Sequence, residues 1–162
     1  MPDRNDILEG LRRSGRILEA FVRTIPAEHV DRIRAAGCWS IAEHVSHLSH
    51  VQPMLLERIL RFMREDQPAF TPYIPGQDEA EERPPVVEMA AAFEAFNAYR
   101  VKQVDLLESA DDITWQKNGR HPEYELYSLY ILARHILMHD HWHMYRMEEL
   151  WLTRDAYLTK LS

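Results

Sequence analysis

Residues 125–151 read ELYSLYILARHILMHDHWHMYRMEELW and contain neither glycine nor proline. Apolar residues recur in this stretch with helical spacing rather than with the alternation of a strand. At about 100° per residue they form one stripe, which contains Leu129, Ala133, Ile136, Met147 and Leu150. The stretch therefore predicts a long amphipathic helix that buries one face against other helices.

Three further stretches show the same helical spacing. They cover residues 3–25, which Pro26 ends, residues 40–64, which begin with a capping box from Ser40 to Glu43, and residues 85–109, with Pro85 in the first turn. Shorter helical turns are predicted at 26–33 and after Thr153. Four long helices predict an all-α fold, a four-helix bundle that forms one domain over residues 1–162, without strands.

The second and third predicted helices are joined by an unusually long connection. Residues 66–85 contain five prolines and one glycine, which exclude regular secondary structure. A loop of this length is either functional or a loose connector. A second loop is predicted at 110–124.

Composition narrows the class of protein. The chain has 162 residues, and 19 Lys+Arg against 26 Asp+Glu give a formal charge of −7, which argues against a nucleic-acid partner. Its 46% of hydrophobic residues exclude wholesale disorder. Cys38 is the only cysteine, the start MPDRNDILEG lacks the apolar run of a signal peptide, and no stretch is long and apolar enough to cross a membrane. We therefore expect a cytoplasmic protein that acts on a small molecule.

Histidine is the unusual residue, with nine in the chain. In the last predicted helix His139 and His143 lie one turn apart on the same edge of the apolar stripe, where two imidazoles can reach one metal ion. Chance placement on a His-rich surface helix is the alternative. His135 lies further round that helix, and His141 points toward solvent.

The second predicted helix carries His44, His47 and His50, each three residues apart. This spacing fans the side chains across the helix, so at most two can share a target with the last helix. His44 falls inside the apolar stripe, whereas His47 lies on its flank, nearer the seam of the bundle. The helical wheel alone therefore favours His44 as the ligand. It does not settle the choice, because a core-facing His44 also fits an ordinary hydrogen-bonded core histidine.

Two charged residues are predicted to face the interior. Arg100 falls within the apolar face of the third helix, and a buried guanidinium needs a partner. That partner is either an acidic residue of a neighbouring helix or a substrate carboxylate. Asp140 points inward as well, where it either orients a metal-binding histidine or makes an inter-helix hydrogen bond. Four aromatic residues either line a pocket or serve in packing: Tyr73, Tyr124, Trp142 and Trp151.

Four motifs, in order along the chain, resemble one family. WSIAEHVSHL at 39–48 resembles the W-x7-H-L signature of the DinB-like/YfiT-like superfamily of metal-binding four-helix bundles, and HDHWH at 139–143 resembles its final H-x3-H. PAFTPY at 68–73 is similar to the P-x3-P-Y loop of YfiT-like members, and GRHP at 119–122 to the G-x-HP before their last helix. The resemblance covers about residues 39 to 150.

This resemblance implies a site and an assembly. Its metal ligands fall on His47, His139 and His143, which would hold one divalent ion, zinc, nickel, iron or manganese, in a homodimeric protein. Four residues then become candidates for supporting the ligands or contacting substrate: His44, Arg100, His135 and Asp140. One position departs from the family, because Arg146 stands where many members have a glutamine.

The resemblance also implies an activity. Known activities of the family include transfer to low-molecular-weight thiols such as bacillithiol and thiol-dependent isomerisation, and many YfiT-like members are labelled metal-dependent hydrolases. Three neutral histidines leave an open position on the ion, so a metal-bound thiolate or water would be the reacting group. We expect an enzyme that transfers a low-molecular-weight thiol to an electrophile. The alternatives are a metal-dependent hydrolase and a non-catalytic metal-binding stress or dimerisation protein. A zincin-type hydrolase is disfavoured, because Asp140 replaces the glutamate of H-E-x-x-H.

Overall fold

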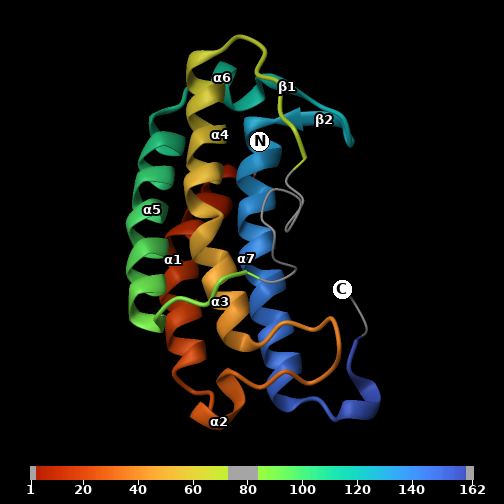
Figure 1. The fold of residues 1–162 in the computed structure, drawn as a ribbon. Helices are drawn as coiled ribbons and strands as arrows, with labels where there is room; N and C mark the ends of the chain where they lie inside the picture. The colour runs from red at the N-terminus through yellow and green to blue at the C-terminus, as the bar shows by residue number, and fades with distance from the viewer. Residues whose placement is uncertain (1–2, 73–83, 160–162) are drawn as a thin grey trace.

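The computed structural model describes residues 3–72 and 84–159, and four long helical columns pack side by side in it (Figure 1). These columns are α1 (Arg4–Val22), α3 (Ile41–His50) continued by α4 (Gln52–Arg64), α5 (Met89–Ser109) and α7 (Leu129–Leu152). The predicted four-helix bundle is therefore confirmed. Tyr73 and much of the predicted loop at 66–85 lie outside the described residues.

The second column is two helices rather than one, and they meet at Val51. Pro53 in the first turn of α4 lacks a backbone N–H, so one helical hydrogen bond cannot form at this point. The predicted capping box begins α3: the Glu43 amide donates to Ser40 Oγ at 3.2 Å, and the Ser40 amide donates to Glu43 Oε2 at 2.6 Å. This cap fixes the start of the helix that carries His44 and His47.

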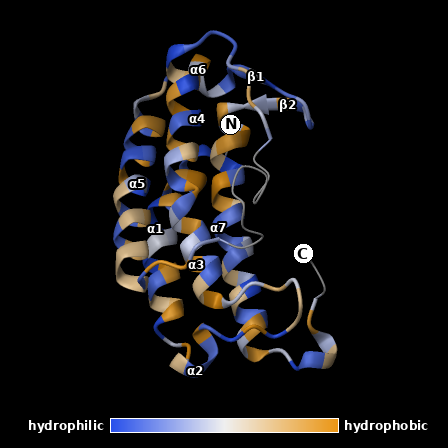
Figure 2. Cartoon of the chain, in the orientation of Figure 1, coloured by the Kyte–Doolittle hydropathy of each residue, from blue (hydrophilic) through white to orange (hydrophobic). Residues whose placement is uncertain are grey.

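Apolar and polar residues are interleaved along the helices (Figure 2), and the buried core divides into two apolar clusters. One is built around Leu11, Ile136 and their neighbours, and the other around Leu18, Met144 and theirs. Between these positions, along the helices, lies a layer of buried polar residues: Ser14, Arg100, Gln103 and Asp140. The interior is therefore polar in its middle, at the level of the histidines of α3 and α7.

The structure corrects the prediction that the chain has no strands. The expected loop at 110–124 contains α6 (Asp112–Gln116), and β1 (Asn118–His121) pairs antiparallel with β2 (Tyr124–Ser128). The last helix begins at Leu129 rather than at 125, because Ser128 caps it by accepting a hydrogen bond from the Ile131 amide. Leu126 and Tyr127 fit a helical stripe, yet they point to opposite faces of a strand, one exposed and the other buried.

Other predicted boundaries shift by a few residues. The helix expected from residue 85 begins at Met89, after Glu88 accepts a hydrogen bond from the Ala91 amide. The expected turn at 26–33 is α2 (Ala27–Val30), and the helix expected after Thr153 is a short 3-10 turn, η1 (Asp155–Tyr157). No helix among the described residues is long and apolar enough to cross a membrane.

The β hairpin is attached to the segment that follows α4. The Phe70 amide donates to the Arg120 carbonyl and the Arg120 amide donates to the Pro68 carbonyl, both at 2.8 Å. Gly119 allows this approach: a Cβ there would lie 2.7 Å from Phe70 Cε2 and 2.9 Å from the Pro68 oxygen. Pro68 and Phe70 of one loop motif thus meet Gly119 and Arg120 of the other, and these contacts hold the hairpin over one side of the bundle.

Candidate metal centre

Three histidine side chains converge between α3 and α7. His47 Nε2 lies 3.3 Å from His139 Nε2, and His143 Nε2 lies 3.1 Å from His139 Nε2. One ring nitrogen from each of the three lies within 4.8 Å of the others. The structure therefore brings together the three residues that the family resemblance selects, from segments about 90 residues apart in the sequence.

The spacing of these nitrogens fits a metal ion. Two nitrogens bound at about 2.05 Å to a tetrahedral ion lie about 3.3 Å apart. His47 Nε2 and His143 Nε2 stand at such distances from His139 Nε2. That the three residues bind a metal ion stays a prediction, and the geometry of the donor set is consistent with it.

Electrostatics favour the form of histidine that binds metal. Burial lowers the pKa of His47 to about 3, and the neighbouring His139 contributes. Burial also lowers the pKa of His139 to about 4, with a smaller effect of Arg100. The pKa of His143 lies far below its usual value because of burial and the histidines around it. All three imidazoles are therefore neutral at neutral pH, with lone pairs available to a cation.

His44 lies behind the cluster rather than in it. Its Nδ1 is 2.8 Å from Nδ1 of His143, and burial lowers its pKa to about 4, with Arg146 the next cause. One nitrogen of this contact carries the proton and the other accepts it. Since the contact occupies Nδ1 of His143, it leaves Nε2 free to face His139. The helical wheel favoured His44 as a ligand, but the structure places His47 in the cluster.

Arg146, which stands at the position of the family's glutamine, is buried near His44. Its Nη1 pairs with Glu149, and its Nη2 donates to the Thr159 carbonyl at 3.3 Å. The guanidinium thus links α7 to the chain that follows η1. Any role that depends on an amide at this position is absent from this chain.

Two tryptophans flank the histidine cluster. The Trp39 ring lies 5.0 Å from the His47 ring and is stacked 6.1 Å from the His143 ring. Trp142, 45% exposed, meets His143 edge-on at 4.8 Å. Sequence reasoning used Trp39 only as part of a motif, whereas the structure makes it an aromatic wall of the site.

Arg100 and Asp140, which the sequence placed in the interior separately, are partners. Arg100 Nη2 lies 2.8 Å from Asp140 Oδ2, and their side chains are only 4% and 1% exposed. The guanidinium carbon also lies 4.8 Å from the centre of the Phe96 ring. Of the alternatives for Arg100, the structure shows the inter-helix ion pair. Asp140 is thereby engaged with a cation and not placed as the base of a zincin.

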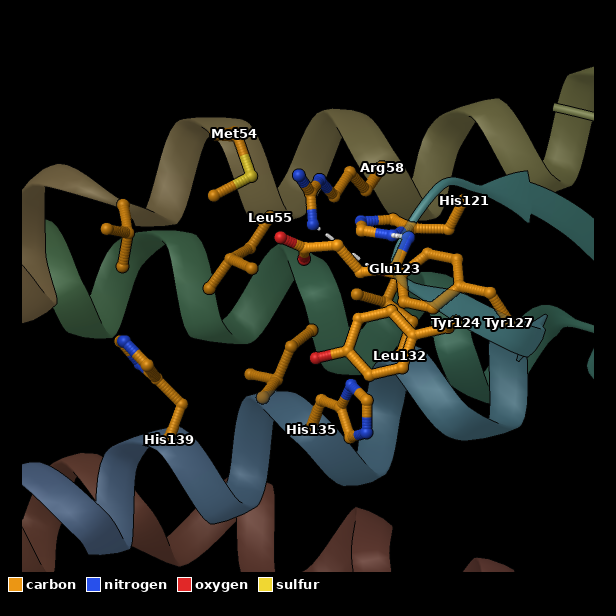
Figure 3. A pocket seen from close by; sticks show the side chains of 12 residues that line it. Met54, Leu55, Arg58, His121, Glu123, Tyr124, Tyr127, Leu132, His135 and His139 are labelled. Atoms are coloured by element: carbon orange, nitrogen blue, oxygen red, sulfur yellow. Dashed lines mark hydrogen bonds between the residues drawn. The ribbon is translucent and has the colours of Figure 1, made fainter. Parts of the chain in front are cut away.

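A pocket of about 230 Å³ opens beside the cluster, and His139 is part of its wall (Figure 3). His135 and His139 face it from α7, and Arg58 faces it from α4. The hairpin supplies four lining residues: His121, Glu123, Tyr124 and Tyr127. Sequence reasoning named His135 and Tyr124 as candidates but missed Arg58 and Tyr127, because the hairpin that brings these residues together was not predicted.

The histidine cluster inside the four-helix bundle, with a pocket at its side, places this protein among the helical-bundle proteins that carry a site in their interior. The sequence matches the DinB superfamily over residues 11–152, and the chain belongs to this superfamily. The chain is also similar to YfiT from Bacillus subtilis, described as "a probable metal-dependent hydrolase with an unusual four-helix bundle topology". The TM-score is 0.73 at 18% identity, over 93% of this chain and 86% of that chain, a likeness of fold. No curated protein matches the chain.

Proposed function

We propose that this protein is a divalent-metal-dependent enzyme that transfers a low-molecular-weight thiol to an electrophilic small molecule. The observation that carries the proposal is the convergence of three neutral imidazole nitrogens beside a pocket. Three protein ligands are typical of a catalytic metal site, because a closed structural site uses four.

His47, His139 and His143 would hold the ion, and zinc, nickel, iron or manganese suit imidazole ligands. When bound, the ion would supply a Lewis acid that lowers the pKa of a thiol or of water next to it. His44 would orient His143 through its Nδ1, and the Trp39 ring, stacked on His143, would form one wall of the site. The pocket on the other side of His139 would hold the electrophile.

The surroundings of the histidines favour a thiol over water as the nucleophile. Hydrolysis at such sites commonly uses a carboxylate as general base. Here Asp140 is paired with Arg100, and Glu43 caps α3. Glu123 also lines the pocket, but it lies exposed in the turn between β1 and β2. A thiol needs no such base, because metal binding itself displaces its proton. The thiol would release its proton to solvent, its sulfur would bond to the electrophilic carbon, and a leaving group would depart with the electron pair.

A second candidate is hydrolysis of an ester or amide with water as the nucleophile. The observation that favours it is the likeness of fold to YfiT, which is described as a probable metal-dependent hydrolase. Both candidates use the same three histidines and the same pocket. They differ in the nucleophile that the site selects.

Metal-loaded protein separates the two candidates. It is mixed with a set of low-molecular-weight thiols and a chromogenic aryl halide, and in parallel with nitrophenyl esters and amides. We expect a thiol conjugate whose formation is lost in His143→Ala and retained in the control His141→Ala. Ester or amide cleavage without any conjugate would overturn the transferase proposal in favour of the hydrolase. Stoichiometric metal without either reaction would favour a non-catalytic metal-binding protein.

A further inference from the structure

The pocket beside the histidine cluster has two unlike ends (Figure 3). His139 lies at one end, where it belongs to the candidate metal centre. Arg58, His121 and Tyr127 gather toward the other end. The lining also contains five apolar side chains: Val51, Met54, Leu55, Leu132 and Ile136. A ligand that fills the pocket would therefore meet a cation at one end and the reacting centre at the other.

Arg58 is held in place without being neutralised by the groups that hold it. Its Nη1 donates to the Tyr127 hydroxyl at 3.1 Å, and its Nη2 donates to the Thr71 carbonyl at 2.8 Å. Both acceptors are uncharged, and they use two of the five N–H donors of a guanidinium. In the part of the chain that the structure describes, Arg58 takes part in no ion pair. A fixed guanidinium with spare donors is a good partner for a carboxylate.

Arg58 is the cationic group at this end of the pocket, because His121 and His135 of the lining favour their neutral form. Burial lowers the pKa of His121, with Arg58 the next cause, and burial also lowers the pKa of His135. Glu123 is the acidic residue of the lining, and it lies exposed in the turn between β1 and β2. A ligand carboxylate next to Arg58 would be opposed by Glu123, so the strength of binding depends on both residues.

The size of the pocket limits the ligand. Its 230 Å³ is below the range of about 300–1,000 Å³ that is typical of sites for drug-sized molecules. Resting on the proposed function, we infer that the electrophilic substrate is a small organic carboxylate, with its carboxylate on Arg58, a short apolar middle part along the wall, and its reacting carbon at the His139 end. Nothing in this assignment depends on which nucleophile the metal centre selects.

Calorimetric titration of the metal-loaded protein with heptanoate tests this assignment. Heptanamide and heptylamine have the same chain with an uncharged or a cationic end, and they serve as matched probes. We expect heptanoate to bind more tightly than either. Arg58→Gln should weaken heptanoate binding by at least about tenfold, the effect of losing one charge-assisted hydrogen bond. Arg58→Lys should keep part of the affinity, and Glu123→Gln should increase it.

The metal ion itself is the competing partner for a carboxylate, and His143→Ala distinguishes the two. Heptanoate binding that persists in His143→Ala within about twofold places the carboxylate on Arg58. Binding that is lost in His143→Ala but unchanged in Arg58→Gln would place it on the metal and overturn the inference. Preference for heptylamine would overturn it as well.

Failure of the proposed function would look different from failure of this inference. If no thiol conjugate forms but heptanoate binding still depends on Arg58, the transferase is wrong and the carboxylate site stands. Circular dichroism and metal content confirm that each Arg58 variant is folded. Glu123→Gln, at an exposed turn, gives an independent reading of the same site if Arg58→Gln does not fold.

Discussion

Nδ1 of His44 lies 2.8 Å from Nδ1 of His143, and this contact leaves Nε2 of His143 directed at His139. The two histidines come from different helices, so the contact holds the candidate ligand in one orientation from behind. Partners of this kind set the tautomer and the direction of a metal-binding imidazole. We therefore propose that His44 positions His143 in the candidate centre.

His44→Ala should weaken metal binding without removing the site. We expect the affinity to fall about 10- to 100-fold, the usual effect of losing a partner behind a ligand, with full occupancy restored at high metal concentration. Competition against a chromophoric chelator measures this affinity. His44→Asn, which keeps a polar group at the position, should recover part of the loss. An unchanged affinity in His44→Ala would contradict the positioning role.

The metal-free protein should lose stability as the pH falls below about 6.5. Burial lowers the folded-state pKa of His44 and His139 to about 4 and of His47 to about 3, whereas unfolded histidine titrates near 6.5. Between these values the unfolded chain binds protons that the folded chain excludes. The free energy of unfolding is therefore unaffected above about pH 6.5. It falls by up to about 1.4 kcal/mol per pH unit for each such histidine as the pH decreases toward 4.

Urea unfolding with a chelator present, at pH 7.5, 6.0 and 5.0, measures this dependence. His44→Asn should reduce the slope, because it removes one of the titrating groups. His141→Asn, at an exposed position, should leave the slope unchanged. Stability that stays constant from pH 7.5 to 5.0 would contradict the burial of neutral histidines.

The ion pair of Arg100 and Asp140 should show strong coupling. Arg100→Met leaves the Asp140 carboxylate buried without its cation, and we expect a loss of about 3–5 kcal/mol in the free energy of unfolding. The double variant with Asp140→Leu removes both charges and should be more stable than Arg100→Met alone. Chemical denaturation of the two single variants and the double variant measures the coupling. Additive effects of the two substitutions would contradict a direct buried pair.

Gly119→Ala should disturb the hairpin and leave the metal centre intact. The added Cβ would lie 2.9 Å from a backbone oxygen, that of Pro68, so the backbone itself must shift. We expect a loss of about 1–3 kcal/mol in stability, together with weaker heptanoate binding. Metal content should not change, because the three histidines lie on α3 and α7. Gly10→Ala is the control, since its added Cβ meets only the flexible end of Leu137, and thermal unfolding compares the two variants.

The helices were predictable because their signals are local. The stripe through Leu129 and Ile136 and the capping box at Ser40 each depend on residues within a few positions of one another. The hairpin depends on a contact that is distant in sequence, the fit of Gly119 against Phe70. Its strand β2 also continues directly into α7 with no glycine or proline between them, so helical periodicity extended the predicted helix too far.

The candidate site was predictable only in part for the same reason. His139 and His143 share a helix, and their separation of four residues places them on one face. The choice between His44 and His47 depends on how α3 packs on α7, which spacing does not reveal, and it came from the family resemblance. No sequence pattern pointed to Arg58, because the role proposed for it depends on its contact with Tyr127 of the hairpin, which was not predicted.

Metal content of the purified, metal-reconstituted protein tests the central claim most directly. Elemental analysis should find close to one divalent ion per chain. His47→Ala, His139→Ala and His143→Ala should each reduce it to background, whereas the exposed His141→Ala should retain it. A wild-type protein without bound metal, or a His47→Ala variant that keeps its ion while His44→Ala loses it, would contradict the three-histidine centre.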